Sequence, residues 1–234
     1  LTGRVADMDR IQTIADKHNL LVLEDAAQAI GARYKGKKAG SFGVCAGFSL
    51  HPLKNLHVHG DGGVITTNDP ELYAIFKKYR NHGLINRDEC EFWGINSRMD
   101  AVHAGIGNIK LKYIDKWNNR YREIAQMYTK SLNGYVNVPI LKEYEEPVFH
   151  RYMIHHPERE ELQGFLADND IETKVNYPIP LHLQPAAKDL GYKKGDYPVT
   201  EELADTILSL PLYPELRDDQ VYYVIEKITQ FCRN

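Results

Sequence analysis

The chain has 234 residues, enough for one or two domains with a hydrophobic core. A net charge of −3 and a pI of about 6.4 give no electrostatic case for binding nucleic acid or an anionic membrane. The three cysteines lie far apart without metal-site spacing, and no apolar run approaches the ~20 residues that span a bilayer. We therefore expect a reduced, cytoplasmic protein without a membrane segment.

The first third of the chain alternates between apolar strands and helices. Residues 7–18 have helical spacing of apolar side chains behind Asp7, which is a suitable N-cap. Asn68-Asp69-Pro70 opens a second helix, with proline in the first turn where its missing N–H costs nothing. The predicted strands are Leu20–Leu23, which should be buried and parallel, Val44–Leu50 and Val64–Thr67. This alternation predicts a doubly wound α/β layer.

The pattern changes after a long helix that is predicted from about Asp100 to Leu132. The later elements are β-like stretches at Phe149–Ile154 and Glu172–Val175, a helix near Glu158–Asn169, and a terminal helix with apolar positions from Val221 to Phe231. Such a mixture is typical of an α+β domain. We therefore predict two domains, residues 1–133 and residues 134–234.

Polar residues follow two of the predicted strands in an arrangement that suits pyridoxal phosphate (PLP). Asp25 comes after the apolar run at 20–23, and Ser49 and Lys54 come at the end of the run at 44–50. A lysine amine can form a Schiff base with the cofactor aldehyde, a carboxylate can pair with the protonated pyridine nitrogen, and a hydroxyl can bind the phosphate. Ser49 and Lys54 are at most ~17 Å apart even in extended chain, so one cofactor can touch both.

Several separated motifs follow one another in the chain. They are EDAAQAIGARYKGKKAGSFG (24–43), FSLHPLKN (48–55), GDGGVITTND (60–69), RNHG (80–83), GINSRMD (94–100), NYPIPLHLQPA (176–186) and SLPLYPEL (209–216). In this order they make the chain resemble the DegT/DnrJ/EryC1/StrS family of PLP-dependent sugar aminotransferases. The resemblance implies an α/β protein of PLP-dependent transferase fold type I: residues 1–133 would be the second part of the large mixed-sheet domain, followed by a small α+β C-terminal domain. It also implies that the family's N-terminal part is missing here.

The resemblance assigns roles to four residues of the first two motifs. Lys54 is expected to be the Schiff-base lysine and catalytic base, and Asp25, in preference to Glu24, the partner of the pyridine nitrogen. Gln28 should hydrogen-bond the cofactor's ring hydroxyl, and Ser49 should bind its phosphate. Each residue type also has an ordinary structural role: a solvated lysine, an N-cap aspartate, a glutamine on a helix surface, or a hydroxyl satisfied by its own backbone.

The later motifs carry three further candidates. Asn96 matches the position that, in the family, reaches the cofactor phosphate of the neighbouring subunit, although an ordinary helix cap is the alternative. Tyr177 and His182 match a loop that approaches the substrate in the family. His57 and His59 alternate like metal ligands, but the sequence offers no evident third ligand, so no metal is expected.

The resemblance implies a homodimer with shared active sites that moves an amino group from L-glutamate or glutamine to a keto-sugar in amino-sugar biosynthesis. The acceptor should be nucleotide-linked, although a keto-cyclitol or a sugar phosphate is left open as an alternative acceptor. Whether the amino group goes to C3 or to C4 is also left open. One alternative is a PLP-dependent sugar dehydratase, but these carry histidine in place of the lysine. The other is a non-catalytic scaffold or sensor that binds a sugar nucleotide, and such a protein would not require the lysine nucleophile.

Overall fold

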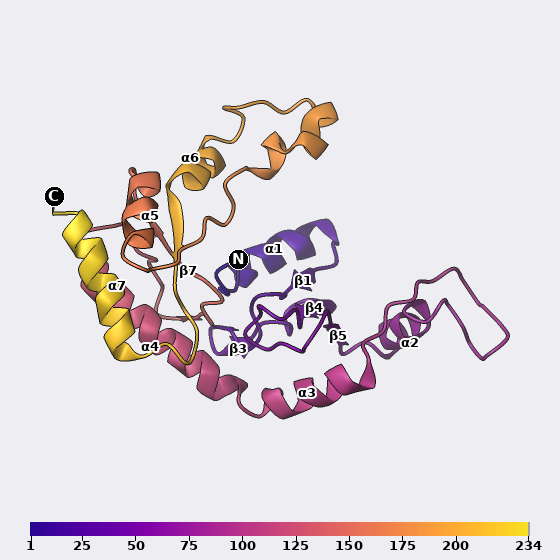
Figure 1. The fold of residues 1–234 in the computed structure, drawn as a ribbon. Coiled ribbons are helices and arrows are strands. Elements are labelled where there is room, and N and C mark those ends of the chain that lie inside the picture. The colour runs from indigo at the N-terminus through magenta and orange to yellow at the C-terminus, as the bar shows by residue number, and fades with distance from the viewer. Residues whose placement is uncertain (234) are drawn as a thin grey trace. The chain divides into compact units, whose positions relative to one another are not determined.

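The structure is a computed structural model that describes residues 1–233 (Figure 1). The chain forms two compact units, the first made of residues 1–119 and 142–150, and the second of residues 120–141 and the chain from Arg151 onward. The first contains α1 (Met8–His18), β1 (Leu23–Asp25), β2 (Arg33–Tyr34), β3 (Lys37–Lys38), β4 (Cys45–Ser49), β5 (Gly63–Thr67), α2 (Pro70–Tyr79), α3 (Ala101–Leu111) and β6 (Glu145–Glu146). The second contains β7 (Tyr152–His155), α5 (Arg159–Ala167), the 3₁₀ helices η1 (Leu181–Leu183) and η2 (Pro185–Leu190), α6 (Pro198–Thr206), β8 (Ile207–Leu210) and α7 (Asp218–Phe231). Helix α4 (Ile114–Leu132) begins in the first unit and continues in the second.

The two units divide the chain differently from the predicted boundary at residue 133. Strand β6 belongs to the first unit because it pairs antiparallel with β2, in the order β3-β2-β6. The division into domains 1–133 and 134–234 stays a prediction.

A mixed three-stranded sheet of order β1-β4-β5 organises the first unit. Strand β1 runs parallel to β4, and β5 runs antiparallel to β4. Figure 1 shows β4 between its two neighbours. The predicted strands at 44–50 and 64–67 are confirmed as β4 and β5. The mixed α/β architecture is confirmed with them.

The predicted buried strand Leu20–Leu23 is wrong in its extent and in its burial. Asn19 ends α1 in a left-handed conformation, and the amide of Leu20 still bonds back to Ala15, so the chain is capping the helix at this point. Strand pairing therefore starts only at Leu23. Strand β1 is at the edge of the sheet, and the side chains of Leu21 and Leu23 are 74% and 70% exposed.

Two groups of buried side chains lie beneath the loops that follow β1 and β4. The first consists of Ala26, Ala29, Ala32 and Val148. The second consists of Leu50, Leu56, Val58 and Ile114. Both loops are therefore anchored in the hydrophobic core of the first unit, although they carry polar residues.

Two helices start where the sequence predicts, but the predicted long helix is not a single helix. Asp7 caps α1, and Asp69 caps α2 with its side chain, as predicted. The single helix predicted over 100–132 is wrong, because the chain breaks between α3 and α4. The amides of Lys112 and Tyr113 bond three residues back rather than four, which tightens the backbone and ends α3 before α4 starts.

The second unit combines a two-stranded antiparallel sheet, β7 with β8, and helices that include α5 and α7. The terminal helix buries Val221, Val224, Ile225 and Ile228, as its apolar spacing predicts. The strand predicted at Glu172–Val175 is wrong: Lys174 makes only an isolated bridge to Ser209, at the side of β8. No helix of the described residues is both long and apolar enough to cross a membrane.

Candidate active site

Asp25 and Ser49 lie at the same edge of the central sheet. Asp25 is the last residue of β1, where its partner on β4 is Gly47, and Ser49 is the last residue of β4. The pairing continues one step further, since the amide of Ala26 donates to Gly47 at 2.9 Å. Parallel neighbouring strands end on the same side, and in α/β sheets this edge is where ligands bind. A carboxylate and a hydroxyl are thus presented side by side.

Glu24 and Asp25 differ sharply in what their carboxylates contact. The Glu24 oxygens accept the amides of Gly40, Phe42 and Gly43 at 2.7, 2.5 and 2.8 Å, so this side chain holds the loop after β3. Asp25 is exposed and uses one oxygen to accept the amide of Ala27 at 3.1 Å. Asp25 therefore has an oxygen to offer to a cation, while Glu24 is committed to its own backbone.

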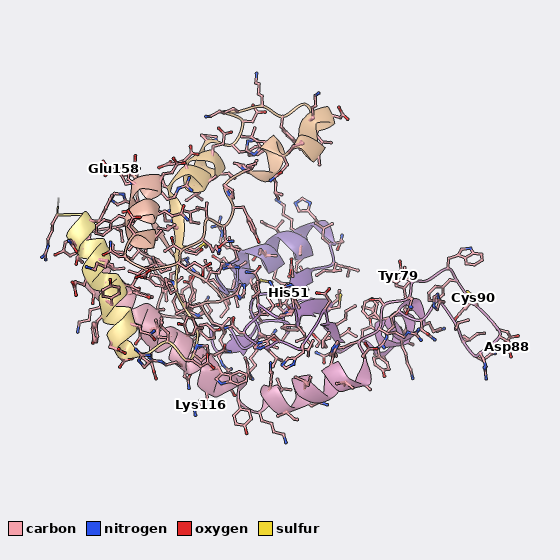
Figure 2. All side chains as sticks on the ribbon, in the orientation of Figure 1. His51, Tyr79, Asp88, Cys90, Lys116 and Glu158 are labelled. Atoms are coloured by element: carbon pink, nitrogen blue, oxygen red, sulfur yellow. The ribbon has the colours of Figure 1, made fainter. Side chains whose placement is uncertain are left out.

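Lys54 is half-buried in the turn after β4, and side chains on both sides fix its main chain. Ser49 Oγ accepts the amide of His51 at 3.3 Å, and His51 Nδ1 accepts the amide of Leu53 at 3.2 Å. The Lys54 amide donates to the His51 carbonyl at 2.9 Å, and His57 Nδ1 donates to the Lys54 carbonyl at 3.0 Å. Figure 2 labels His51 in this loop.

Gln28 lies beside the main chain of Leu1. Gln28 Nε2 donates to the Leu1 carbonyl at 2.7 Å. Gln28 lies in a turn and not on a helix, so the expectation of a helical position for it is wrong.

Asn96 is exposed, and its contacts are with its own loop. It forms an antiparallel bridge with Asn81, and its Oδ1 accepts Arg98 Nε at 2.9 Å. Arg98 also donates to Asn81 Oδ1 at 3.2 Å. A guanidinium has only donors, so it fixes the oxygen end of the Asn96 amide toward Arg98 and turns the NH₂ end away. The predicted phosphate contact of Asn96 stays a prediction.

Tyr177 and His182 belong to the second unit and differ in exposure. Tyr177 is 63% exposed, whereas His182 Nε2 bonds to Glu201 at 2.9 Å with both side chains largely buried. Both oxygens of Glu201 also accept the amide of Gly195, and the bond from His182 is the main cause that lowers the pKa of Glu201. The ring of His182 thus holds its own loop together. Substrate contact by either residue stays a prediction.

Asn55 and Asn118 were not identified from the sequence. Asn55 directly follows Lys54 and is 5% exposed, and Asn118 is 1% exposed. The signal for Asn118 was available: it lies on the same helical face as the buried Ile114, Ala125 and Leu132, where an amide needs a specific partner.

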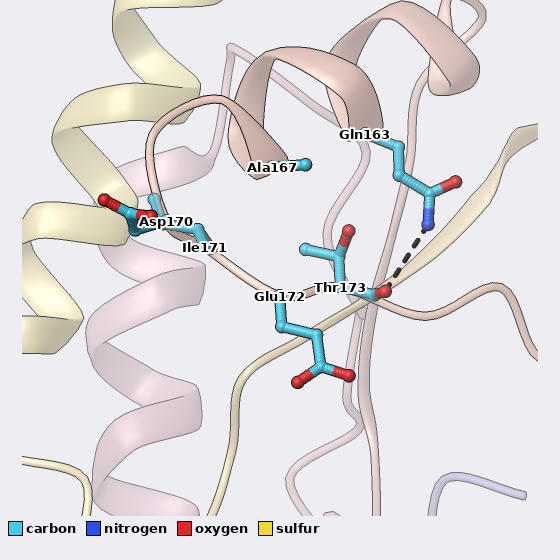
Figure 3. Close-up of a pocket in the computed structure, with 6 residues that line it drawn as sticks. All are labelled: Gln163, Ala167, Asp170, Ile171, Glu172 and Thr173. Atoms are coloured by element: carbon cyan, nitrogen blue, oxygen red, sulfur yellow. Dashed lines mark hydrogen bonds between the residues drawn. The ribbon is translucent and has the colours of Figure 1, made fainter.

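Among the described residues, no group of three or more His, Cys, Asp or Glu side chains is placed to hold a metal ion. A cavity of about 360 Å³ lies in the second unit. Its lining consists of Gln163, Ala167, Asp170, Ile171, Glu172 and Thr173 (Figure 3). Gln163 Nε2 donates across it to the Thr173 carbonyl at 3.4 Å. None of the predicted site residues lines this cavity.

Known proteins match this chain over all or nearly all of its length. A pleiotropic regulatory protein of Geobacillus stearothermophilus is 45% identical over 100% of this chain, and the match covers 64% of that protein. The dTDP-3-amino-3,4,6-trideoxy-alpha-D-glucose transaminase of Streptomyces venezuelae is 38% identical over 99% of this chain and 62% of its own length. The crystal structure of S. venezuelae DesV matches with a TM-score of 0.97 at 38% identity, over 100% of this chain and 64% of that one.

The chain therefore spans a little under two thirds of the length of these relatives. The profile of the DegT/DnrJ/EryC1/StrS aminotransferase family matches residues 1–229. Mixed α/β architecture, close structural superposition and family profile agree, and the resemblance seen in the sequence motifs is confirmed: the chain belongs to the DegT/DnrJ/EryC1/StrS aminotransferase family.

Proposed function

We propose that this protein is a PLP-dependent aminotransferase that moves an amino group from L-glutamate or glutamine to a nucleotide-linked keto-sugar in amino-sugar biosynthesis. The observation that carries the proposal is the shared strand edge. Asp25 and Ser49 end neighbouring parallel strands, and Lys54 lies in the turn beyond Ser49. An acid, a hydroxyl and a half-buried lysine near one such edge suit a ligand that carries a cationic ring nitrogen, a phosphate and an aldehyde.

The residues present fit PLP. An exposed carboxylate oxygen of Asp25 suits a protonated ring nitrogen, and the Ser49 hydroxyl suits a phosphate. Gln28 follows Asp25 by three residues and carries an amide donor, which here bonds to the Leu1 carbonyl. Lys54, Asp25, Gln28 and Ser49 would hold the cofactor from this chain, and Asn96 would serve the neighbouring subunit.

Bound PLP supplies a ring that accepts the electron pair of the bond broken at the donor's α-carbon. Lys54 would take the proton from that carbon and deliver it to the cofactor. The amine must be uncharged to accept that proton. The negative charge of Asp25 keeps a proton on its ring partner throughout.

The names of several relatives support a nucleotide-linked acceptor. They include a dTDP-3-amino-3,6-dideoxy-alpha-D-galactopyranose transaminase of Aneurinibacillus thermoaerophilus and a GDP-perosamine synthase of Escherichia coli O157:H7, at 41% and 38% identity. The sugar and the carbon that is aminated differ among them. For this protein we propose the acceptor class, glutamate or glutamine as donor, a cytoplasmic homodimer, and no nucleic acid partner.

The full-length protein, reconstituted with PLP, should convert L-glutamate to 2-oxoglutarate once per active site without an acceptor. Turnover should appear only when one of a panel of dTDP-, UDP- or GDP-linked keto-sugars is added, with ping-pong kinetics. A reconstituted protein that leaves both glutamate and glutamine unchanged would rule the proposal out.

A regulatory protein that binds a sugar nucleotide without turnover is the second candidate. It is favoured by the name of the relative that is 45% identical, a pleiotropic regulatory protein. The same glutamate experiment separates the two, because the visible absorption of a lysine-bound cofactor should disappear on adding the donor only if the protein is an aminotransferase. The lysine argues for the enzyme, since binding alone does not require a nucleophile.

A further inference from the structure

Asn55 and Asn118 form a buried amide pair directly behind Lys54. Asn55 Nδ2 donates to Asn118 Oδ1 at 3.0 Å and to the Val148 carbonyl at 2.9 Å. Asn55 Oδ1 accepts His150 Nδ1 at 3.3 Å, because an amide oxygen has no proton to give. Asn118 Nδ2 donates to the Ile30 carbonyl at 3.0 Å. Four segments of the first unit therefore meet at two side chains.

The bonds fix both amides in a single orientation. Asn55 Nδ2 faces two oxygen acceptors, and Asn118 presents its oxygen to Asn55 and its nitrogen to Ile30. Gly31 has a φ of +85°, and a Cβ on it would come within 2.7 Å of Asn118 Nδ2. Glycine is thus required for this close approach. A buried, fully bonded amide network holds its surroundings rigid, whereas any lost partner leaves a costly unpaired group.

The two ends of this pair are next to the proposed cofactor residues. Asn55 is the residue after Lys54, and Ile30 is two residues after Gln28. We propose that Asn55 and Asn118 are positioning residues, which hold Lys54 at its working place and couple it to the turn that carries Gln28. This inference rests on the proposed aminotransferase function. Neither amide is a catalytic residue, because neither touches the reacting atoms.

The test uses Asn118→Leu in the full-length protein. This change keeps the branch at Cγ but makes the side chain larger, and it removes the partners of Asn55 and Ile30. We expect kcat to fall about 10- to 100-fold with a much smaller change in KM, because a catalytic group displaced by about 1 Å loses rate on this scale. The rate at which Lys54 captures PLP covalently should fall as well. In the protein without PLP, the amides of residues 29–31 and 54–56 should exchange faster.

The matched control is Tyr128→Phe in the second unit. Tyr128 is fully buried and its hydroxyl donates to the Pro211 carbonyl at 3.0 Å, so this variant also loses a buried hydrogen bond and orphans a carbonyl. It should lower the urea midpoint and leave kcat and the capture rate unchanged. If Asn118→Leu fails to fold, Asn118→Ser, which keeps a small polar group at the site, replaces it.

The outcomes are distinguishable. A folded Asn118 variant that keeps wild-type capture and kcat overturns the positioning role, and so does an equal loss of kcat in Tyr128→Phe. A wild-type protein that binds PLP but never transfers an amine would instead defeat the proposed function. In that case the capture rate and the amide exchange still decide whether the pair positions Lys54.

Discussion

Lys54 lies in a turn whose main chain is bonded on both sides, so its replacement should remove chemistry without removing structure. Lys54→Ala should abolish transamination while PLP still binds non-covalently, because no other group would carry the proton at the reacting carbon. The measurement is the rate of 2-oxoglutarate release with and without added small amines. If the alanine variant kept its rate without such amines, another residue would be the base.

Two adjacent acids allow a second comparison at this scale. Glu24→Gln removes the charge that accepts three main-chain amides, and it should destabilise the protein by about 1–3 kcal/mol while kcat changes little. Asp25→Asn should do the reverse, with a large loss of kcat and a small change in stability. Urea unfolding and steady-state kinetics on both variants check the contrast. If both variants lost stability and kcat to the same extent, the proposed division into a structural Glu24 and a catalytic Asp25 would be wrong.

The segment from η1 to α6 contains a close contact between two titratable side chains, His182 and Glu201. The pKa of Glu201 is lowered in the folded protein, mainly by the bond from His182. A lowered carboxylate pKa means that its stabilisation is complete above the ordinary value of 4.5 and is lost as the pH falls through the folded value. The protection factors of the amides of residues 181–201 should therefore fall, and proteolytic cleavage of this segment should become faster, as the pH falls below about 4.5.

Glu201→Gln should remove this dependence, because an amide does not titrate in this range. Glu202→Gln is the matched control, one residue further along α6 and exposed. Proteolysis at a series of pH values, corrected for the protease's own profile, measures the difference. An unchanged profile in Glu201→Gln would assign the pH response to another group.

The elements that the sequence predicts well are those whose signals are local. Asp7 and Asp69 mark helix starts through their own side-chain bonds, and the apolar spacing of α7 survives into the fold. The break at Lys112 and Tyr113 carries no proline or glycine, so the pattern gave no reason to expect it. Candidate site residues near Lys54 could be found by motif. Asn118 was missed: its place among the buried positions of α4 was a signal, but its partner, 63 residues away in the chain, could not be inferred from that pattern.

The proposed homodimer makes the predicted role of Asn96 testable. In the proposed homodimer, Asn96 donates to a phosphate held mainly by the partner subunit. A neutral donor to a charged phosphate contributes about 1.5–3 kcal/mol, so Asn96→Ala should weaken PLP binding roughly ten- to a hundredfold. Equilibrium titration of the variant with PLP measures this loss.

Subunit exchange tests the shared site directly. At a PLP concentration that leaves Asn96→Ala largely without cofactor, mixing Lys54→Ala with Asn96→Ala should restore some activity, because one site of each mixed dimer receives both defects and the other receives none. If exchange is proven and nothing is recovered, Asn96 serves its own chain. If Asn96→Ala binds PLP as tightly as the wild type does, its phosphate role is wrong.

The amide pair behind Lys54 also dictates when the site can form during synthesis and folding. The Lys54 turn is local, but its anchors lie 63 and 93 residues further along the chain. Contacts of such sequence separation form late, since the closure of long loops must precede them. We therefore expect the lysine turn of a nascent chain to become ordered only after about residue 150 has left the ribosome. Pulsed hydrogen exchange should find the amides around Lys54 protected together with those of residues 114–118, and after those of α1.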